Sequence, residues 1–176
     1  MRQARRRWIA AAGAAALAGA FAPPAAAQAT PRDGRDFRLV KPQQATEAPA
    51  GRIEVIEFFW YGCPHCNALE PVIKEWVAKL PADVAFRRVH VPFGDRRHQQ
   101  LFYTLEAMGK ADALGDKVFH AIHVDRDRLD TVDKMTAMLS RHGVDRKQFT
   151  DTFESFAVRT KMRRAAQVSE AYGVAG

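Results

Sequence analysis

The stretch IEVIEFFWYGCPHC, residues 53–66, decides how the rest of the sequence is interpreted. Residues 53–60 are apolar, aromatic and β-branched apart from two glutamates, which is typical of a buried central strand. A Tyr-Gly pair leads from this strand into Cys63 and Cys66. Apolar residues beyond them recur at helical spacing, namely Leu69, Val72, Ile73, Trp76, Val77 and Leu80. Pro71 is expected to interrupt and kink that helix because it lacks an N–H. The two cysteines are therefore predicted to lie where a strand gives way to a helix.

A thiol at the start of a helix has distinctive chemistry. The first turn of a helix leaves backbone N–H groups without partners and carries partial positive charge. A thiolate at Cys63 would accept those N–H groups, so its pKa is expected to be lowered. Cys66 lies one turn further into the helix and is suited to resolve a mixed disulfide. Pro64 is compatible with a first helical turn because the N–H that it lacks would go unused there.

His65 sets the expected direction of the redox reaction. Its ring can place positive charge or an N–H donor beside the thiolate, which would lower the pKa of Cys63 further. Groups that stabilise the reduced pair raise its reduction potential. The sequence therefore predicts an oxidant that gives away a Cys63–Cys66 disulfide.

Two other uses of the cysteine pair are weaker. A zinc site needs two more ligands at suitable spacing, but the sequence has no second C-x-x-C, and His90 and His98 are isolated. A purely structural disulfide would close a loop of only four residues, which constrains the unfolded chain little. We therefore expect neither a metal nor a cofactor.

Glu57 is an acid inside an otherwise apolar strand. Burial of a charge without a partner is costly, so two explanations stay open. Glu57 either lies beneath the cysteines and relays protons as Cys66 cycles between thiol and disulfide, or it pairs with a lysine or arginine. Perturbed acids occur both at functional sites and in ion-pair networks.

The remaining pattern predicts an α/β protein. Residues 84–91 alternate as a second strand should, which makes a βαβ unit with the first strand and its helix. Residues 28–50 form an extended lead-in with a short edge strand at 37–40, and residues from about 98 to 172 are helical throughout. The helical stripes expected in the core are Leu101, Leu105 and Met108; Leu114, Val118 and Ile122; Met135, Met138 and Leu139, ended by Gly143; Phe149, Phe153 and Phe156 behind an N-cap at Asp145; and Val158, Met162, Ala165, Ser169 and Tyr172.

The N-terminus predicts export. Residues 1–27 carry four arginines and no acid, followed by an apolar run and small residues, as in a secretory signal peptide. The pair Arg5-Arg6 leaves the general and the twin-arginine export routes both open. Without this segment the 27 basic residues of the chain fall to 23 against 20 acidic ones, a net charge of +3 instead of +7. A net charge this small, scattered along the chain, argues against nucleic acid as a partner. The apolar run near the N-terminus is too short for stable membrane insertion.

The run EFFWYGCPHC at residues 57–66, continued by Leu69-Glu70-Pro71, resembles the DsbA family of periplasmic thiol:disulfide interchange proteins. The resemblance implies a thioredoxin-like fold with an inserted helical domain. Residues 28–94 would form the lead-in and the thioredoxin-like βαβ part, residues 95–158 the inserted domain, and residues 159–176 a return helix. It also implies site roles: Cys63 as nucleophile, Cys66 as resolving thiol, His65 as the residue that tunes the redox pair, with Pro64 beside it, and Glu57 as buried acid.

The family also implies partners. Unfolded exported polypeptides with free cysteines would be the substrates, and a DsbB-like, quinone-linked membrane oxidase would restore the disulfide. The family has a cis-proline loop, two further strands and a last helix beyond the point where this chain ends, at Gly176. We therefore expect the C-terminal strands and helix to be missing from this chain, and the chain alone to be unstable or weakly active.

Two alternative functions remain. The first is a periplasmic disulfide reductase or isomerase, which the reduction potential would separate from an oxidase. The second is a redox-inactive protein that binds unfolded peptides through its exposed apolar surface, and that would tolerate loss of Cys63.

Overall fold

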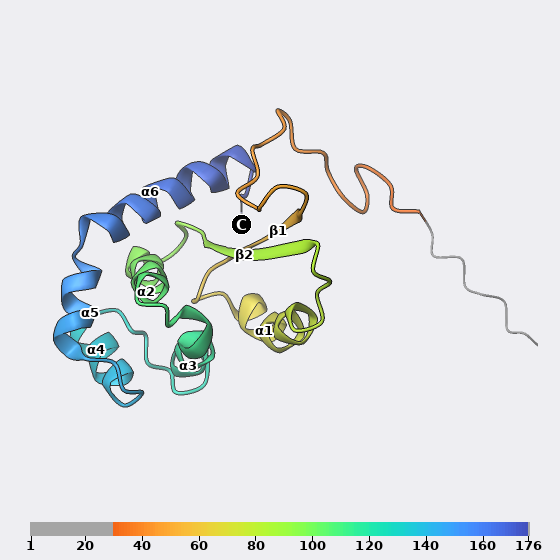
Figure 1. The fold of residues 1–176 in the computed structure, drawn as a ribbon. Helices are drawn as coiled ribbons and strands as arrows, with labels where there is room; N and C mark the ends of the chain where they lie inside the picture. The colour runs from red at the N-terminus through yellow and green to blue at the C-terminus, as the bar shows by residue number, and fades with distance from the viewer. Residues whose placement is uncertain (1–29, 176) are drawn as a thin grey trace, which may run out of the picture. The chain divides into compact units, whose positions relative to one another are not determined.

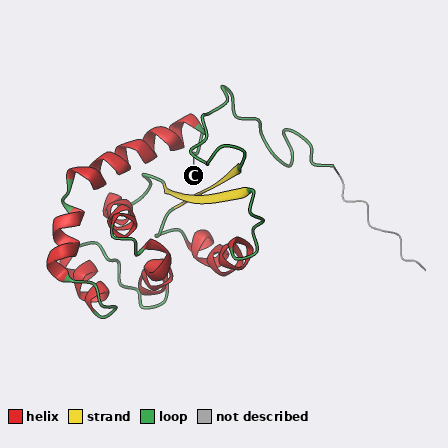
Figure 2. Ribbon diagram, in the orientation of Figure 1, coloured by secondary structure: helices red, strands yellow, loops and turns green. Residues whose placement is uncertain are grey.

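The computed structural model describes residues 30–175, so the signal peptide predicted for residues 1–27 lies outside the described part of the chain. Residues from Val40 onward form one compact unit of two strands and six helices (Figures 1 and 2). In chain order its elements are β1 (Ile53–Phe59), α1 (Pro64–Val77), β2 (Val84–His90), α2 (Arg96–Ala107), α3 (Ala111–His123), α4 (Val132–Ser140), α5 (Arg146–Phe153) and α6 (Phe156–Ala171).

The predicted βαβ unit is confirmed. β1 and β2 are parallel neighbours, and α1 connects the end of β1 to the start of β2. The register pairs Ile53 with Val84 and Phe59 with His90, so that Glu57 lies beside Arg88. α1 begins at Pro64 as expected, but the interruption predicted at Pro71 is wrong, because the helix runs through that residue to Val77.

Helices lie on both faces of this small sheet (Figure 1). On one face α1 packs against β2, where the rings of Trp76 and Phe86 have centroids 5.9 Å apart. On the other face Phe58 of β1 meets Tyr172, which follows α6, with ring centroids 5.3 Å apart. Successive residues of a strand point to opposite faces, so Glu57 and Arg88 belong to the α1 face.

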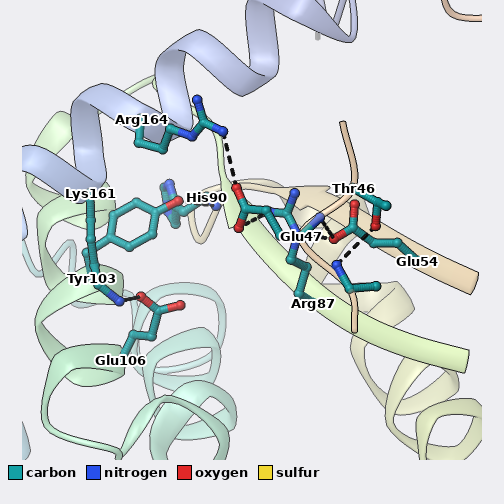
Figure 3. Close-up of polar contacts among 10 residues, drawn as sticks. Thr46, Glu47, Glu54, Arg87, His90, Tyr103, Glu106, Lys161 and Arg164 are labelled. Atoms are coloured by element: carbon teal, nitrogen blue, oxygen red, sulfur yellow. Dashed lines mark hydrogen bonds and ion pairs between the residues drawn. The ribbon is translucent and has the colours of Figure 1, made fainter. Parts of the chain in front are cut away.

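The α6 face carries a set of ion pairs (Figure 3). One carboxylate oxygen of Glu54 accepts hydrogen bonds from the backbone N–H of Glu47 at 3.0 Å and from Arg87 Nε at 2.9 Å. The carboxylate of Glu47 in turn lies 3.5 Å from a guanidinium nitrogen of Arg164, on α6. These contacts join the lead-in segment, both strands and α6.

The main hydrophobic core lies among α2–α6. Most of the predicted stripes are buried, and Leu101, Leu105, Val118, Met135, Leu139, Phe149 and Val158 are inaccessible to solvent. The carboxylate of Asp145 accepts the Gln148 N–H at 2.7 Å, which confirms the predicted N-cap of α5. No helix of the described residues is long and apolar enough to cross a membrane.

Two other sequence expectations are wrong. Phe156 does not extend the stripe of α5, because Ser155 caps a new helix and leaves Phe156 70% exposed in its first turn. Residues 37–40 do not form an edge strand either: the one bridge there joins Phe37 to Asp33. The Asp36 carboxylate accepts the Arg32 N–H at 3.0 Å, and such local side-chain bonds favour a turn over an extended ladder.

Candidate active site

Cys63 is the N-cap of α1. Its backbone is extended, with φ −83° and ψ 118°, and its sulfur accepts the backbone N–H of Cys66 at 3.4 Å. The N–H of Cys63 donates to the carbonyl of Trp60 at 3.0 Å, which closes a turn between β1 and the helix. The sulfur therefore faces the unpaired N–H groups of the first helical turn, as the spacing of the sequence predicted.

The pKa values of the two thiols are shifted in opposite directions. Burial by itself would raise the pKa of Cys63, but hydrogen bonds from the backbone and thiol of Cys66 and from the backbone of His65 outweigh it, and the pKa is lowered. Burial raises the pKa of Cys66 to about 11. At neutral pH the outer sulfur is thus the better thiolate and leaving group, while the inner one holds its proton.

His65 acts on this site through its backbone. The side chain is exposed to solvent, and the contact that favours the Cys63 thiolate is the His65 N–H. Within residues 30–175 no hydrogen bond or ion pair reaches the ring of His65. Its effect in this structure follows from its place in the first helical turn, and the ring's expected part stays a prediction.

Glu57 belongs to a buried ion-pair network that the sequence did not reveal. Arg88 binds both carboxylate oxygens of Glu70, at 3.0 and 2.8 Å, and its Nε lies 2.8 Å from Glu57 Oε2. Burial raises the pKa of Glu57, while the nearby Arg88 opposes that rise. The negative charge of Glu57 is also among the causes that keep the pKa of Cys66 high, after burial. Glu57 therefore has the arginine partner of one explanation, and the proton-relay role of the other stays a prediction.

Arg88 and Glu70 left only a faint signal in the sequence. Arg88 is the residue of β2 in register with Glu57, and Glu70 follows Cys66 by four residues, about one helical turn. The guanidinium also lies over the rings of Phe59 and Phe86, 5.6 and 5.8 Å from their centroids. Two carboxylates share this one cation, so the network has a net negative charge unless one carboxylate is protonated.

An aromatic cluster surrounds Tyr61, a central residue of the turn that joins Trp60 to Cys63. The Tyr61 side chain is buried against Phe59, His90, Phe102 and Phe119, with ring centroids 5.0 to 6.1 Å away. Burial lowers the pKa of His90 to about 3, so that its ring is neutral. His90 Nδ1 donates to the adjacent Val91 carbonyl at 3.0 Å, and its Nε2 accepts the Tyr61 N–H at 3.2 Å.

The histidines discussed as possible metal ligands are in structural use. One ring nitrogen of His98 lies 2.7 Å from the Arg128 carbonyl, and both ring nitrogens of His90 are occupied as described above. Across residues 30–175 no group of three or more His, Cys, Asp or Glu side chains could hold a metal ion.

Two thiols one helical turn apart with oppositely shifted pKa values are characteristic of the dithiol centres of thioredoxin-like proteins. Comparison with known families agrees: residues 54–176 match the model of the DSBA-like thioredoxin domain. The chain belongs to this DsbA family.

Its relatives include thiol:disulfide interchange proteins DsbA. That of Burkholderia cepacia is 40% identical over 153 residues, which cover 86% of this chain and 72% of the relative. That of Azotobacter vinelandii is 43% identical over 145 residues, covering 81% of this chain and 67% of the relative. The crystal structure of Pseudomonas aeruginosa DsbA superposes with a TM-score of 0.72 at 43% identity, over 77% of this chain and 71% of that one.

Proposed function

We propose that this chain is a dithiol oxidase that donates a Cys63–Cys66 disulfide to cysteines of newly exported proteins. The opposite pKa shifts of the two thiols carry the proposal. A lowered pKa at the outer sulfur stabilises the reduced pair and makes it the better leaving group, which favours transfer of the disulfide to the substrate.

The reaction proceeds in two exchanges. A substrate thiolate attacks Cys63 Sγ, a new S–S bond forms, and the Cys63–Cys66 bond breaks with its electron pair on Cys66. Cys66 then takes up a proton, as its pKa of about 11 requires. A second substrate thiolate attacks the substrate sulfur of the mixed disulfide, and Cys63 leaves as a thiolate. The substrate loses two electrons and becomes a disulfide, and the protein gains them as its dithiol.

Glu57 is the proposed proton relay for Cys66. Burial leaves Glu57 with a raised pKa although Arg88 opposes the rise, and its charge acts on the inner thiol. A carboxyl with a raised pKa can hold a proton and pass it to the departing Cys66 sulfur. The network of Arg88 and Glu70 keeps that carboxyl in place when it is ionised.

The proposal extends to compartment and partner. Oxidation of exported proteins by this route belongs in the periplasm, in keeping with the predicted signal peptide. A DsbB-like membrane oxidase linked to quinone would reoxidise the dithiol. The chain's membership of the DsbA family supports both parts of this proposal, and the sequence of residues 1–27, which is outside the described structure, supports export.

The experiment is an oxidation assay with the purified chain. The oxidised protein is mixed with a reduced, unfolded protein that has two cysteines, and substrate disulfide is measured by mass. We expect Cys63→Ser and Cys66→Ser each to abolish the reaction, because neither variant can form the Cys63–Cys66 disulfide that is transferred. Equal activity of wild type and Cys63→Ser would refute the proposal.

Equilibration with glutathione separates the oxidase from its nearest alternative. A reduction potential above that of glutathione supports the oxidase, since such a pair gives its disulfide away. A potential well below it would assign the chain as a reductase. Retained binding of unfolded peptides by Cys63→Ser, without any exchange by the wild type, would support the redox-inactive alternative.

A further inference from the structure

The backbone of Tyr61 is held from two sides by histidines distant in sequence. Its N–H donates to His90 Nε2, from β2, at 3.2 Å. Its carbonyl lies 2.8 Å from Nε2 of His123, the last residue of α3. A carbonyl only accepts hydrogen bonds, so His123 must carry its proton on Nε2 at this contact. Nothing in the chemistry of the cysteines described so far uses His123.

The Tyr61 carbonyl is the group that sets the orientation of the cysteine turn. The bond from the Cys63 N–H to the Trp60 carbonyl closes a β-turn in which Tyr61 and Gly62 are the central residues. The two common turn types differ by a flip of the central peptide, and the flipped form needs a positive φ at the third residue. Gly62 does not have such a φ, but glycine could adopt one at little cost. The local sequence thus permits both orientations.

Packing holds the His123 ring at this carbonyl. The ring stacks on Phe119, one turn earlier on α3, with centroids 6.1 Å apart and planes 28° apart. Phe119 in turn meets the Tyr61 ring edge to face at 5.0 Å. Helix α3 therefore contributes two contacts to Tyr61: the ring of Phe119 packs against its side chain, and the Nε2–H of His123 donates to its carbonyl.

We propose that His123 is a positioning residue whose Nε2–H selects one orientation of the Tyr61–Gly62 peptide and so places Cys63 at the N-terminus of α1. A flipped peptide would move Cys63 relative to the N–H groups that favour its thiolate. Helix α3 thereby acts on the reactive sulfur through the backbone of the turn that precedes it. This inference rests on the proposed function only in taking Cys63 as the reacting thiol.

The test measures Cys63 reactivity without any substrate protein. In full-length, reduced chain carrying Cys66→Ala, the rate of alkylation by iodoacetamide is followed from pH 4 to 10, which gives the pKa and thiolate fraction of Cys63. His123→Phe keeps the stack on Phe119 but loses the donor, and His123→Gln keeps an N–H at the position of Nε2. His120→Phe, on the same helix with a solvent-exposed side chain, is the matched control.

The loss of one hydrogen bond predicts a raised Cys63 pKa in His123→Phe, and with it a roughly two- to tenfold lower alkylation rate at pH values below that pKa. His123→Gln and His120→Phe should match the parent. Unchanged reactivity in His123→Phe, or an equal loss in His123→Gln, would overturn the inference.

Two further measurements distinguish a failure of this inference from a folding defect and from a failure of the proposed function. If His123→Phe does not fold, nitrogen NMR of the unsubstituted chain decides: neutral His123 with its proton on Nε2 supports the contact, and a proton on Nδ1 overturns it. The oxidation assay is independent of both. A chain that fails to oxidise substrate while His123→Phe still lowers Cys63 reactivity would refute the proposed function and leave this inference standing.

Discussion

The part formed by β1, α1 and β2 and the part formed by α2–α6 bury very different side chains. In α1 the single buried residue is Glu70, and Leu69, Val72 and Trp76 are 42 to 60% exposed. Each helix from α2 to α6 instead buries at least two apolar side chains. The reactive cysteines and buried charges thus lie in the lightly packed part, and most of the hydrophobic stabilisation lies in the other.

This contrast has a physical reason. Redox chemistry needs an accessible sulfur and polar groups whose proton affinity is perturbed, and such groups cost stability when they are buried. The helices supply a rigid, apolar support that meets the cysteine region at the ring of Tyr61. Four predictions test the contrast, from the largest effect to the smallest.

The largest difference in stability between the two parts should come from truncating one apolar side chain in each. Phe149→Ala, at a fully buried position of α5, should lower the free energy of unfolding by about 3–5 kcal/mol because it leaves a cavity. Val72→Ala, on α1 and 60% exposed, should change it by less than about 0.5 kcal/mol. Urea unfolding of both variants measures the difference. Equal losses would show that the two parts are packed alike.

In the lightly packed part, folding stability should depend most on the buried charges. Arg88→Met leaves Glu57 and Glu70 without their cation and should cost about 3 kcal/mol, near the lower end for a broken buried pair, because 15% of the arginine side chain is exposed.

The matched control for that loss is Arg146→Met. Its side chain is 63% exposed, and the expected change is within about 0.5 kcal/mol. The cost of Arg88→Met should shrink as the pH falls, because the freed carboxylates can then take up protons. A cost that is the same at all pH values would mean that charge is not its cause.

Two glycines offer a smaller, local comparison. Gly94 and Gly143 have φ values of +62° and +75°, and a Cβ on Gly94 would overlap the indole of Trp60 whereas one on Gly143 meets no atom within 4 Å. Gly143→Ala should cost about 1 kcal/mol from backbone strain alone. Gly94→Ala should cost about 2 kcal/mol, since the ring must also move. Thermal unfolding with tryptophan fluorescence tests both, and no shift of the Trp60 signal in Gly94→Ala would contradict the overlap.

The last prediction concerns how stability depends on pH. The quantity is the free energy of unfolding of the reduced chain minus that of the oxidised chain, in which neither thiol titrates. The lowered pKa of Cys63 makes the relative stability of the reduced chain rise with pH up to the ordinary thiol pKa of about 8.5. Above that pH it should fall, because Cys66 keeps its proton in the folded state until about pH 11. Denaturation midpoints of both redox forms give this curve. A difference that does not vary with pH would contradict the asymmetry of the two thiols.

The parts of this protein that rest on local patterns were predictable. A run of apolar, aromatic and β-branched residues predicted β1, alternation predicted β2, and helical periodicity predicted most of the apolar stripes of the helices. The spacing of Cys63 and Cys66 placed them at the start of α1. Local rules failed where a neighbouring side chain changed the outcome, as the Ser155 cap did for Phe156 and the Asp36 carboxylate did for residues 37–40.

By itself the sequence determined the dithiol centre, because an N-cap cysteine, a proline at the first helical position and a second cysteine one turn on are neighbours along the chain. Only the tertiary structure decided what surrounds that centre. Arg88 meets Glu70 across 18 residues, and Tyr61 meets His90 and His123 across 29 and 62. Contacts at such separations leave no periodic signal, since they arise when the sheet and the helices pack together and bring those side chains to the same place.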